Sequence, residues 1–264
     1  MNTKKRAEDF VLVHKEILSS NFTRLDLLSS TELPLIEAGQ FVQVQIPSSL
    51  YGWLRIPISI HDVRAKERIL SLLVQKVGDG SIQLSSCPEN SKINLIYPLG
   101  KGFTMPNLEL ASLDTSILLV GGGCGIAPLL YLAKNLKENG IKTSVLLGAR
   151  SRDQLICQET LSSYASLYPC TEDGSVGFKG LVTEHPLWKM ESFSHIYTCG
   201  PTPMMKAVAA LSVKMGSKHC QVSLENTMAC GLGACLCCVT PSAQGHNLCV
   251  CTDGPVFDAS VLGW

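Results

Sequence analysis

The sequence lacks a long hydrophobic run, and this absence limits where the protein is expected to reside. No segment contains about 18 consecutive apolar residues, the length that a transmembrane helix requires. The basic start, residues 1–6, is followed by Ala7-Glu8-Asp9 and not by the hydrophobic region of a signal peptide. We therefore expect a cytoplasmic protein without a membrane-spanning segment.

Charge is also scarce. Charged residues make up 17% of the 264 residues, and the 22 basic side chains balance the 22 acidic ones. This balance gives no reason to expect nucleic acid or an anionic membrane as a partner. With 45% hydrophobic residues the chain can bury ordinary cores, and its length suggests two domains. The low charge also permits a surface covered by another subunit, because interface cores are depleted of charge.

Cysteine, in contrast, is abundant. In a reducing compartment the 12 cysteines are not expected to form disulfides, and a cysteine cluster there indicates metal or redox chemistry. Six of them lie between Cys230 and Cys251. We expect the other six to be small buried hydrophobic residues; they are Cys87, Cys124, Cys157, Cys170, Cys199 and Cys220.

The clustered cysteines have the spacing of a plant-type 2Fe–2S site. Cys230, Cys235 and Cys238 form a C-x4-C-x2-C run, and either Cys251 or Cys249 can supply the fourth ligand; we predict Cys251. Glycines 231 and 233 permit positive φ and a close approach of backbone N–H groups to the sulfurs. Structural zinc more often uses two C-x2-C knuckles, which this loop does not have. Cys237 adjoins a ligand and is expected to point away from the cluster.

The chain changes character near residue 105. Before it, short apolar runs separated by turn signals indicate an antiparallel β-barrel. After it, the apolar run 117–120 is typical of a buried parallel strand, and strands near 143–147 and 195–199 alternate with helices near 129–139 and 203–215. This alternation predicts an α/β doubly wound parallel sheet. We expect a barrel domain at 1–105, a nucleotide domain at 106–218 and a cluster segment at 219–264.

Glycine-rich turns follow two of the predicted parallel strands. The first turn contains Gly121, Gly122, Gly123 and Gly125. It departs from the G-x-G-x-x-G fingerprint, yet its glycines and the following helix N-terminus suit a phosphate. Cys199-Gly200-Pro201 follows a later strand, where its cysteine can approach a nicotinamide ring. Simple tight turns remain the alternative at both places. In the barrel, residues 55–60 and 77–81 are weaker phosphate candidates, and a hairpin turn is the favoured interpretation of these runs.

Together these motifs resemble the ferredoxin–NADP reductase superfamily and, within it, the family of electron-transfer subunits of class 1B dihydroorotate dehydrogenase. The resemblance covers nearly the whole chain in order. It rests on the flavin motif at 56–59, the glycine turn at 78–81, the linker motif at 98–103, the nicotinamide-side turns at 121–128 and 199–205, and the cluster signature at 223–238 and 250–257. The cluster signature is the most specific of these.

The resemblance implies three cofactors: FAD between the barrel and the nucleotide domain, NAD on the nucleotide domain, and a 2Fe–2S cluster. The FAD residues that it implies are Arg55, Ile56, Pro57, Ile58, Ser59, Leu73, Val74, Gln75, Gly80 and Ser81. The implied NAD residues are Gly121, Gly122, Gly123, Gly125, Cys199, Gly200 and Pro201. One departure concerns the arginine of the family's flavin motif, because Ile56 takes its place and Arg55 lies one residue earlier.

The resemblance also implies a partner, an FMN-containing dihydroorotate dehydrogenase catalytic subunit, in a heterotetramer of two plus two. Electrons would come from dihydroorotate through FMN, pass through the cluster to FAD, and leave as hydride to NAD+ in pyrimidine biosynthesis. No general acid or base is assigned in this chain. A sulfide- or ferredoxin-linked NAD(P)H oxidoreductase subunit is the first alternative, and a zinc-binding structural module is the second. The sequence leaves NAD versus NADP open.

Overall fold

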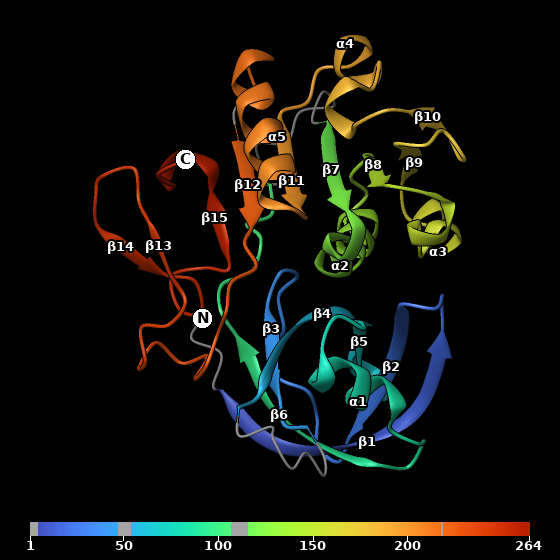
Figure 1. Ribbon diagram of the computed structural model, residues 1–264, viewed down its shortest axis with the longest axis vertical. Coiled ribbons are helices and arrows are strands. Elements are labelled where there is room, and N and C mark those ends of the chain that lie inside the picture. Colours follow the sequence, from blue (N-terminus) through green and yellow to red (C-terminus); the bar gives the residue numbers. More distant parts are fainter. Residues whose placement is uncertain (1–4, 47–53, 107–115, 218) are drawn as a thin grey trace.

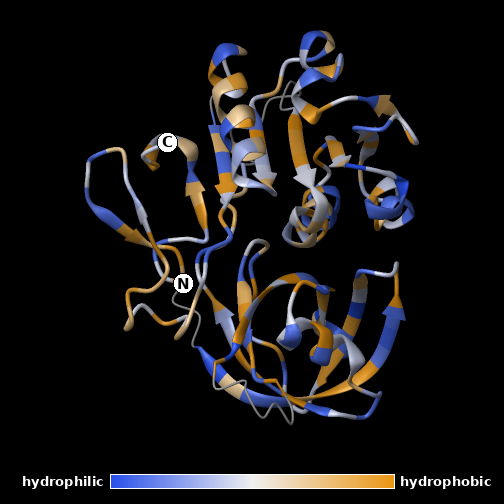
Figure 2. Ribbon diagram, in the orientation of Figure 1, coloured by the Kyte–Doolittle hydropathy of each residue, from blue (hydrophilic) through white to orange (hydrophobic). Residues whose placement is uncertain are grey.

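A closed antiparallel barrel forms the first lobe of the molecule (Figure 1). The computed structural model describes residues 5–46, 54–106, 116–217 and 219–264. The barrel strands are β1 (Arg6–Ile17), β2 (Phe22–Ser29), β3 (Phe41–Val44), β4 (Ile56–Arg64), β5 (Ile69–Gln75) and β6 (Lys92–Leu99), in the order β1-β2-β5-β4-β3-β6. Helix α1 (Asp79–Ser86) follows β5 on the outside of the barrel. Apolar strand residues fill its interior (Figure 2).

A seven-stranded sheet with helices on both faces forms the second lobe. Its strand order is β10-β9-β8-β7-β11-β12-β15, and all neighbours are parallel except β12 and β15. The strands are β7 (Ile117–Gly122), β8 (Thr143–Ala149), β9 (Ser166–Thr171), β10 (Phe178–Lys179), β11 (His195–Cys199), β12 (His219–Ser223) and β15 (Val256–Asp258). The helices are α2 (Ile126–Glu138), α3 (Gln158–Ser162), α4 (Leu187–Met190) and α5 (Thr202–Lys214). The predicted barrel and doubly wound sheet are confirmed.

The C-terminal segment is joined to both lobes. Strand β12, which begins at the first residue of the predicted cluster segment, continues the nucleotide sheet beside β11, and β15 extends that sheet further. Between them lies a small hairpin of β13 (Val239–Pro241) and β14 (Asn247–Cys249). On the barrel side, the Lys101 N–H donates to Gly254 O at 2.6 Å. The segment is therefore fixed between the two domains.

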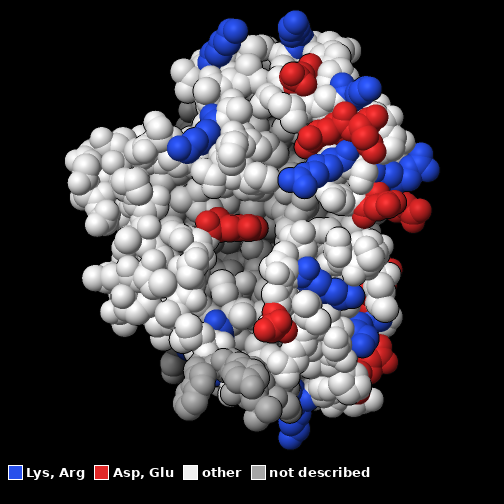
Figure 3. Space-filling view, in the orientation of Figure 1, with Lys and Arg blue, Asp and Glu red and all other residues white. Residues whose placement is uncertain are grey.

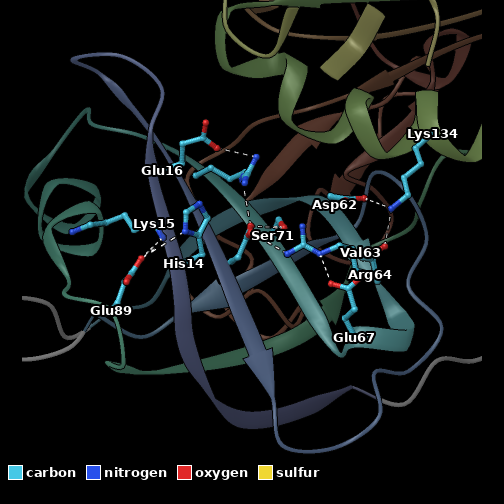
Figure 4. Close-up of polar contacts among 12 residues, drawn as sticks. His14, Lys15, Glu16, Asp62, Val63, Arg64, Glu67, Ser71, Glu89 and Lys134 are labelled. Atoms are coloured by element: carbon cyan, nitrogen blue, oxygen red, sulfur yellow. Dashed lines mark hydrogen bonds and ion pairs between the residues drawn. The ribbon is translucent and has the colours of Figure 1, made fainter. Parts of the chain in front are cut away.

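Helix α2 makes the main contact between the lobes by packing against β4. Lys134 Nζ lies 2.8 Å from Asp62 Oδ1 and donates to Val63 O at 3.1 Å (Figure 4). His61 Nδ1 lies 3.0 Å from Ala127 O and must donate to it, because a carbonyl only accepts. His61 is 2% exposed, and its pKa is lowered, chiefly because burial disfavours the charged ring.

Two local expectations need correction. Residues 78–81 form no hairpin turn, because they open helix α1 instead. Helix α2 begins at Ile126, three residues before the predicted start, because the glycine turn passes directly into it through a short 3-10 turn. In the described part of the chain, no helix is long and apolar enough to cross a membrane.

Candidate functional site

A cavity of about 450 Å³ lies where the barrel, the nucleotide domain and the C-terminal segment meet. Strands β4 and β5 and the start of α1 form its barrel side, and Cys124 and Ala127 approach from the nucleotide domain. Its lining residues are Phe41, Ile56, Pro57, Ile58, Ser59, Leu73, Gln75, Val77, Gly78, Asp79, Gly80, Ser81, Cys124, Ala127, Leu224, Glu225, Asn226, Met228 and Pro255. Figure 3 shows a hollow between the lobes whose visible walls are mostly uncharged. Most of the residues predicted to contact FAD converge here.

Strand β4 presents Pro57 and Ser59 toward this cavity. Ile56 and Ile58 line the cavity as well but direct their side chains toward the barrel core, because adjacent strand side chains point to opposite faces. Val74 follows the same rule: it is fully buried in the barrel core, whereas its neighbours Leu73 and Gln75 line the cavity. The Val74 side chain therefore lies in the barrel core and does not line the cavity.

The N-terminus of α1 opens on the same cavity. The first helical N–H groups have no partner within a helix, so a helix start favours an anion such as a pyrophosphate. Gly80 lies at this start, where a Cβ would lie 3.3 Å from the Ile56 side chain. The Ser81 hydroxyl accepts the N–H groups of Val77 and Gly78 and donates to Gly78 O at 2.9 Å. Ser81 thus shapes the anion-binding turn through its own backbone contacts.

Arg55 does not line the cavity. Its guanidinium donates to Gln43 O at 3.2 Å, to Asn94 O at 3.1 Å and to Asn94 Oδ1. These bonds tie Arg55 to β3 and β6, the two strands that carry Gln43 and Asn94. This placement argues against Arg55 as the substitute for the family's flavin-binding arginine.

The C-terminal segment contributes a wall that sequence reasoning missed. Leu224, Glu225, Asn226 and Met228 line the cavity just before the first cluster cysteine. Desolvation raises the pKa of the Glu225 carboxyl at this wall. These residues follow β12, and the pairing of β12 with β11 brings them to the cavity. The only sequence signal was their place within the cluster signature.

A second cavity, of about 420 Å³, lies at the carboxyl ends of the parallel strands, where such sheets bind nucleotides. Gly122, Gly123 and Pro201 line it as predicted for NAD, whereas Gly121, Gly125, Cys199 and Gly200 do not. The full lining is Gly122, Gly123, Gly148, Ala149, Arg150, Gln154, Glu172, Gly180, Leu181, Val182, Thr183, Pro201, Pro203, Met204 and Ala207. Arg150 and Glu172, the charged residues of this wall, were missed because they follow β8 and β9 without a recognisable motif.

The glycines that do not line the second cavity hold its two turns together. A Cβ on Gly125 would lie 2.0 Å from Cys199 O, and a Cβ on Gly200 would lie 3.0 Å from Gly122 N. Only glycine permits this approach of two backbones. Cys199 is 1% exposed, and burial raises the pKa of its thiol well above the usual value. The Cys199 side chain is therefore buried and does not line the second cavity.

The cluster loop directs backbone N–H groups at the predicted ligand sulfurs. Leu232 N–H donates to Cys230 Sγ at 3.3 Å, Gly233 N–H to Cys251 Sγ at 3.1 Å, and Cys251 N–H to Cys238 Sγ at 3.4 Å. Such donors stabilise thiolates and are typical of iron–sulfur sites. Glycines 231 and 233 have φ of +68° and +83°, the left-handed conformation that the loop needs.

The thiols differ in how readily they ionise. The N–H groups of Leu232 and Cys235 lower the pKa of Cys230 to about 6, which favours its thiolate at neutral pH. Burial and the neighbouring Cys238 raise the pKa of Cys251 to about 12, so metal binding must displace its proton. Among the described residues, no three His, Cys, Asp or Glu side chains converge on a single metal ion. A cluster of two irons spreads its four cysteines over two metals, and this thiol set suits it.

Two family descriptions match the chain. Residues 225–263 match the "Iron-sulfur cluster binding domain of dihydroorotate dehydrogenase B", and residues 119–210 match the "Oxidoreductase NAD-binding domain". Among solved structures, an NADH-dependent reduced ferredoxin-NADP oxidoreductase, studied for flavin-based electron bifurcation, is 30% identical with a TM-score of 0.86. The alignment covers 97% of this chain and 90% of that one. These matches support FAD, a 2Fe–2S cluster and NAD as the cofactors of this oxidoreductase subunit.

Curated relatives extend over most of the chain. The "Dihydroorotate dehydrogenase B (NAD(+)), electron transfer subunit" of Fusobacterium nucleatum is 37% identical over 84% of this chain and 85% of its own length. The protein of the same description from Geobacillus sp. is 34% identical over 96% of this chain and 97% of its own length. The chain therefore belongs to the family of dihydroorotate dehydrogenase B electron-transfer subunits.

Proposed function

We propose that this chain passes electrons from a partner catalytic subunit, which oxidises dihydroorotate, to NAD+ in pyrimidine biosynthesis. The observation that carries the proposal is the continuity of three sites. Residues 224–226 and Met228 line the first cavity, and Cys230 begins the cluster loop two residues later. Cys124 of the β7–α2 turn connects the first cavity to the nucleotide domain. One-electron and two-electron carriers can therefore occupy neighbouring places on one chain.

The residues of each site have distinct tasks. Pro57, Ser59 and the start of α1 would hold FAD, and residues 122–123 with Pro201 would hold NAD. Cys230, Cys235, Cys238 and Cys251 would hold the cluster. When bound, the cluster supplies one-electron transfer and FAD converts it to the two-electron chemistry of the nicotinamide.

The partner in this proposal is an FMN-containing catalytic subunit, assembled with this chain as two plus two in the cytoplasm. FAD and NAD account for the two cavities above, which leaves dihydroorotate oxidation to another chain. A cluster is useful when electrons come from a second flavin that lies too far away for direct hydride transfer. The segment after His219 supports a covered surface there, because it contains no lysine or arginine.

The test compares the holoprotein alone with the holoprotein mixed with its catalytic subunit. Alone, it should reduce an artificial dye with NADH and leave dihydroorotate unchanged. With the catalytic subunit, dihydroorotate should reduce NAD+ at a rate that saturates with added subunit. Dihydroorotate oxidation by the isolated chain would contradict the proposal.

A second candidate is a subunit of a ferredoxin-linked oxidoreductase, because the ferredoxin-NADP oxidoreductase structure resembles this chain over nearly its whole length. The same preparation distinguishes the two. Rapid NADH-dependent reduction of ferredoxin, together with no coupled reaction with the catalytic subunit, would favour the second candidate.

A further inference from the structure

Gln43 carries a buried polar group without a described partner. It lies on β3 and is 0% exposed, and neither its Nε2 nor its Oε1 has a hydrogen-bond partner among the described residues. An unsatisfied buried amide costs about 1–3 kcal/mol, so buried polar groups are nearly always paired. The carboxamide therefore indicates a partner that the protein atoms do not include.

The direction of this side chain follows from the strand. Val42 and Val44 point into the barrel core, so Phe41 and Gln43 point outward. Phe41 belongs to the core that contains Cys238 and Cys251, which places this outer face of β3 against the cluster segment. Gln43 is thus a barrel residue covered by the iron–sulfur segment.

The carboxamide touches the cluster loop next to its first cysteine. A Cβ on Gly231 would lie 2.6 Å from Gln43 Cγ and 2.8 Å from Gln43 Nε2. Gly231 is the residue after Cys230, in the turn that directs N–H groups at the cysteine sulfurs. The amide end of Gln43 therefore reaches the part of the loop that encloses the predicted cluster.

The backbone beneath Gln43 is fixed in place. Arg55 donates to Gln43 O at 3.2 Å and also to Asn94 O on β6, so it links β3 to its neighbouring strand β6. Arg55, which does not line the FAD cavity, therefore has a structural role in the barrel. It ties the part of β3 that carries Gln43 to β6.

We propose that the Gln43 Nε2–H group donates a hydrogen bond to a sulfur of the 2Fe–2S cluster and so raises the cluster's reduction potential. The inference rests on the proposed ligand set. A donor stabilises the additional negative charge of the reduced cluster, and hydrogen bonds to the sulfurs are one of the levers by which proteins set such potentials. Gln43 is then a positioning and tuning residue that the flavin barrel contributes to the iron site.

The test replaces Gln43 with methionine, which has a similar length and no donor, in the holoprotein with FAD. We expect two irons per chain to remain and the flavin potential to stay unchanged. The midpoint potential of the cluster, followed by electron paramagnetic resonance during a redox titration, should become more negative. A tenfold change in the one-electron reduction equilibrium corresponds to about 59 mV, and we expect a shift of at least this size.

Gln40 provides the matched control. It is also buried, but its Oε1 accepts from Glu37 N–H at 2.8 Å and its Nε2 donates to Gly100 O at 3.0 Å. Gln40→Met should therefore reduce stability without moving the cluster potential. An unchanged potential in Gln43→Met with full iron content would overturn the role of Gln43, and would indicate that a buried water satisfies the amide. Absence of any cluster signal in the unmodified protein would instead overturn the proposed ligand set.

A second measurement needs no substitution and applies even if Gln43→Met loses its cluster. In protein labelled with ¹⁵N at glutamine side chains, electron–nuclear double resonance of the reduced cluster should show a ¹⁵N coupling. Of the glutamines described, Gln43 is the one in contact with the cluster loop through Gly231. If no such coupling is found in the reduced protein, the proposal is wrong.

Discussion

Cys249 and Cys251 are separated by one residue, yet their sulfurs have different surroundings. Cys251 is 1% exposed, and its Sγ accepts the Gly233 N–H, whereas the Cys249 N–H is held by Asp253 at 2.7 Å. We expect Cys251→Ser to lose the cluster and Cys249→Ser to keep about two irons per chain, with iron content and the visible spectrum as the measurement. Cys237→Ser serves as the control, since the Cys237 thiol is exposed and faces Thr227 O. If Cys249→Ser loses the cluster and Cys251→Ser keeps it, Cys249 is the fourth ligand.

Glu172 and Arg150 face the NAD cavity from neighbouring strand ends. The Glu172 N–H donates to Ala149 O at 3.1 Å, which ties the end of β9 to the end of β8. A carboxylate suits the ribose 2′-hydroxyl of NAD and repels the 2′-phosphate of NADP. We expect Glu172→Gln to raise the NADPH-to-NADH ratio of kcat/KM by about tenfold, equivalent to about 1.4 kcal/mol. Equal loss with both nucleotides would assign Glu172 a structural role.

Single residues differ in how far the sequence determines their roles. The cysteine spacing predicted thiols that the structure surrounds with N–H donors, because a cluster loop is built from neighbouring residues. Glu225 and Gln43 could not be found in this way. The surroundings of Glu225 arise from the pairing of β12 with β11. Those of Gln43 arise because a segment about 190 residues further along the chain covers β3. The residues next to each position in the sequence carry no signal of such long-range contacts.

Helix α2 contacts the barrel through His61 of β4, which bonds to Ala127 O. Burial lowers the pKa of His61 below its usual 6.5, so the unfolded chain takes up a proton that the folded chain excludes. The stability that this provides is present above about pH 6.5 and is lost as the pH falls toward the lowered value. We expect the free energy of unfolding, measured by urea denaturation, to fall between pH 7 and pH 5.

The matched variant for this prediction is His61→Asn, which retains a donor for Ala127 O but does not titrate. Its free energy of unfolding should be lower than that of the unmodified protein at pH 7, and should change less between pH 7 and pH 5. Asp26, whose pKa is lowered because Arg64 and Ser71 bond to its carboxylate, contributes at more acidic pH and is outside this window. An equal pH dependence in both proteins would show that the His61 contact does not determine it.

Elements were predictable where their patterns were strong. Strand β11 begins and ends at the predicted residues, and the continuous apolar run 117–120 lies in the buried parallel strand β7. The short helix α1 was missed because Gly78-Asp79-Gly80 has turn composition, and its helical form depends on the Ser81 hydroxyl bonding back to the turn. Strand β9 has the mixed sequence Ser-Leu-Tyr-Pro-Cys-Thr and depends on its pairing with β8.

At the scale of the whole molecule, exposed apolar side chains mark one surface of the cluster segment. Leu232 and Leu236 are 43% and 62% exposed, and Leu236 has a φ of +55°, a conformation that aspartate tolerates better than leucine. We expect Leu236→Asp to remain folded and to weaken binding of the catalytic subunit. Burial of a leucine contributes about 1.5–3 kcal/mol, so the dissociation constant should rise by about ten- to a hundredfold.

Isothermal titration of the catalytic subunit with the holoprotein measures this effect, and NADH-dependent dye reduction by the chain alone should be unchanged. Val213→Asp is the control, because Val213 is 78% exposed near the C-terminal end of α5 in the nucleotide domain, outside the cysteine loop 230–238. If both variants bind the catalytic subunit as tightly as the unmodified chain does, the cluster segment is not the binding surface.

The short stretch from Leu224 to Met228 has a consequence for how the holoprotein is assembled. Its residues, apart from Thr227, line the flavin cavity, and the stretch leads into Cys230. When one cofactor binds and fixes the conformation of this stretch, the site of the other cofactor is fixed as well. Thermodynamic reciprocity then requires that each cofactor strengthen the affinity for the other by the same factor. Iron starvation should therefore produce chains that release flavin, and flavin starvation should produce chains that release iron.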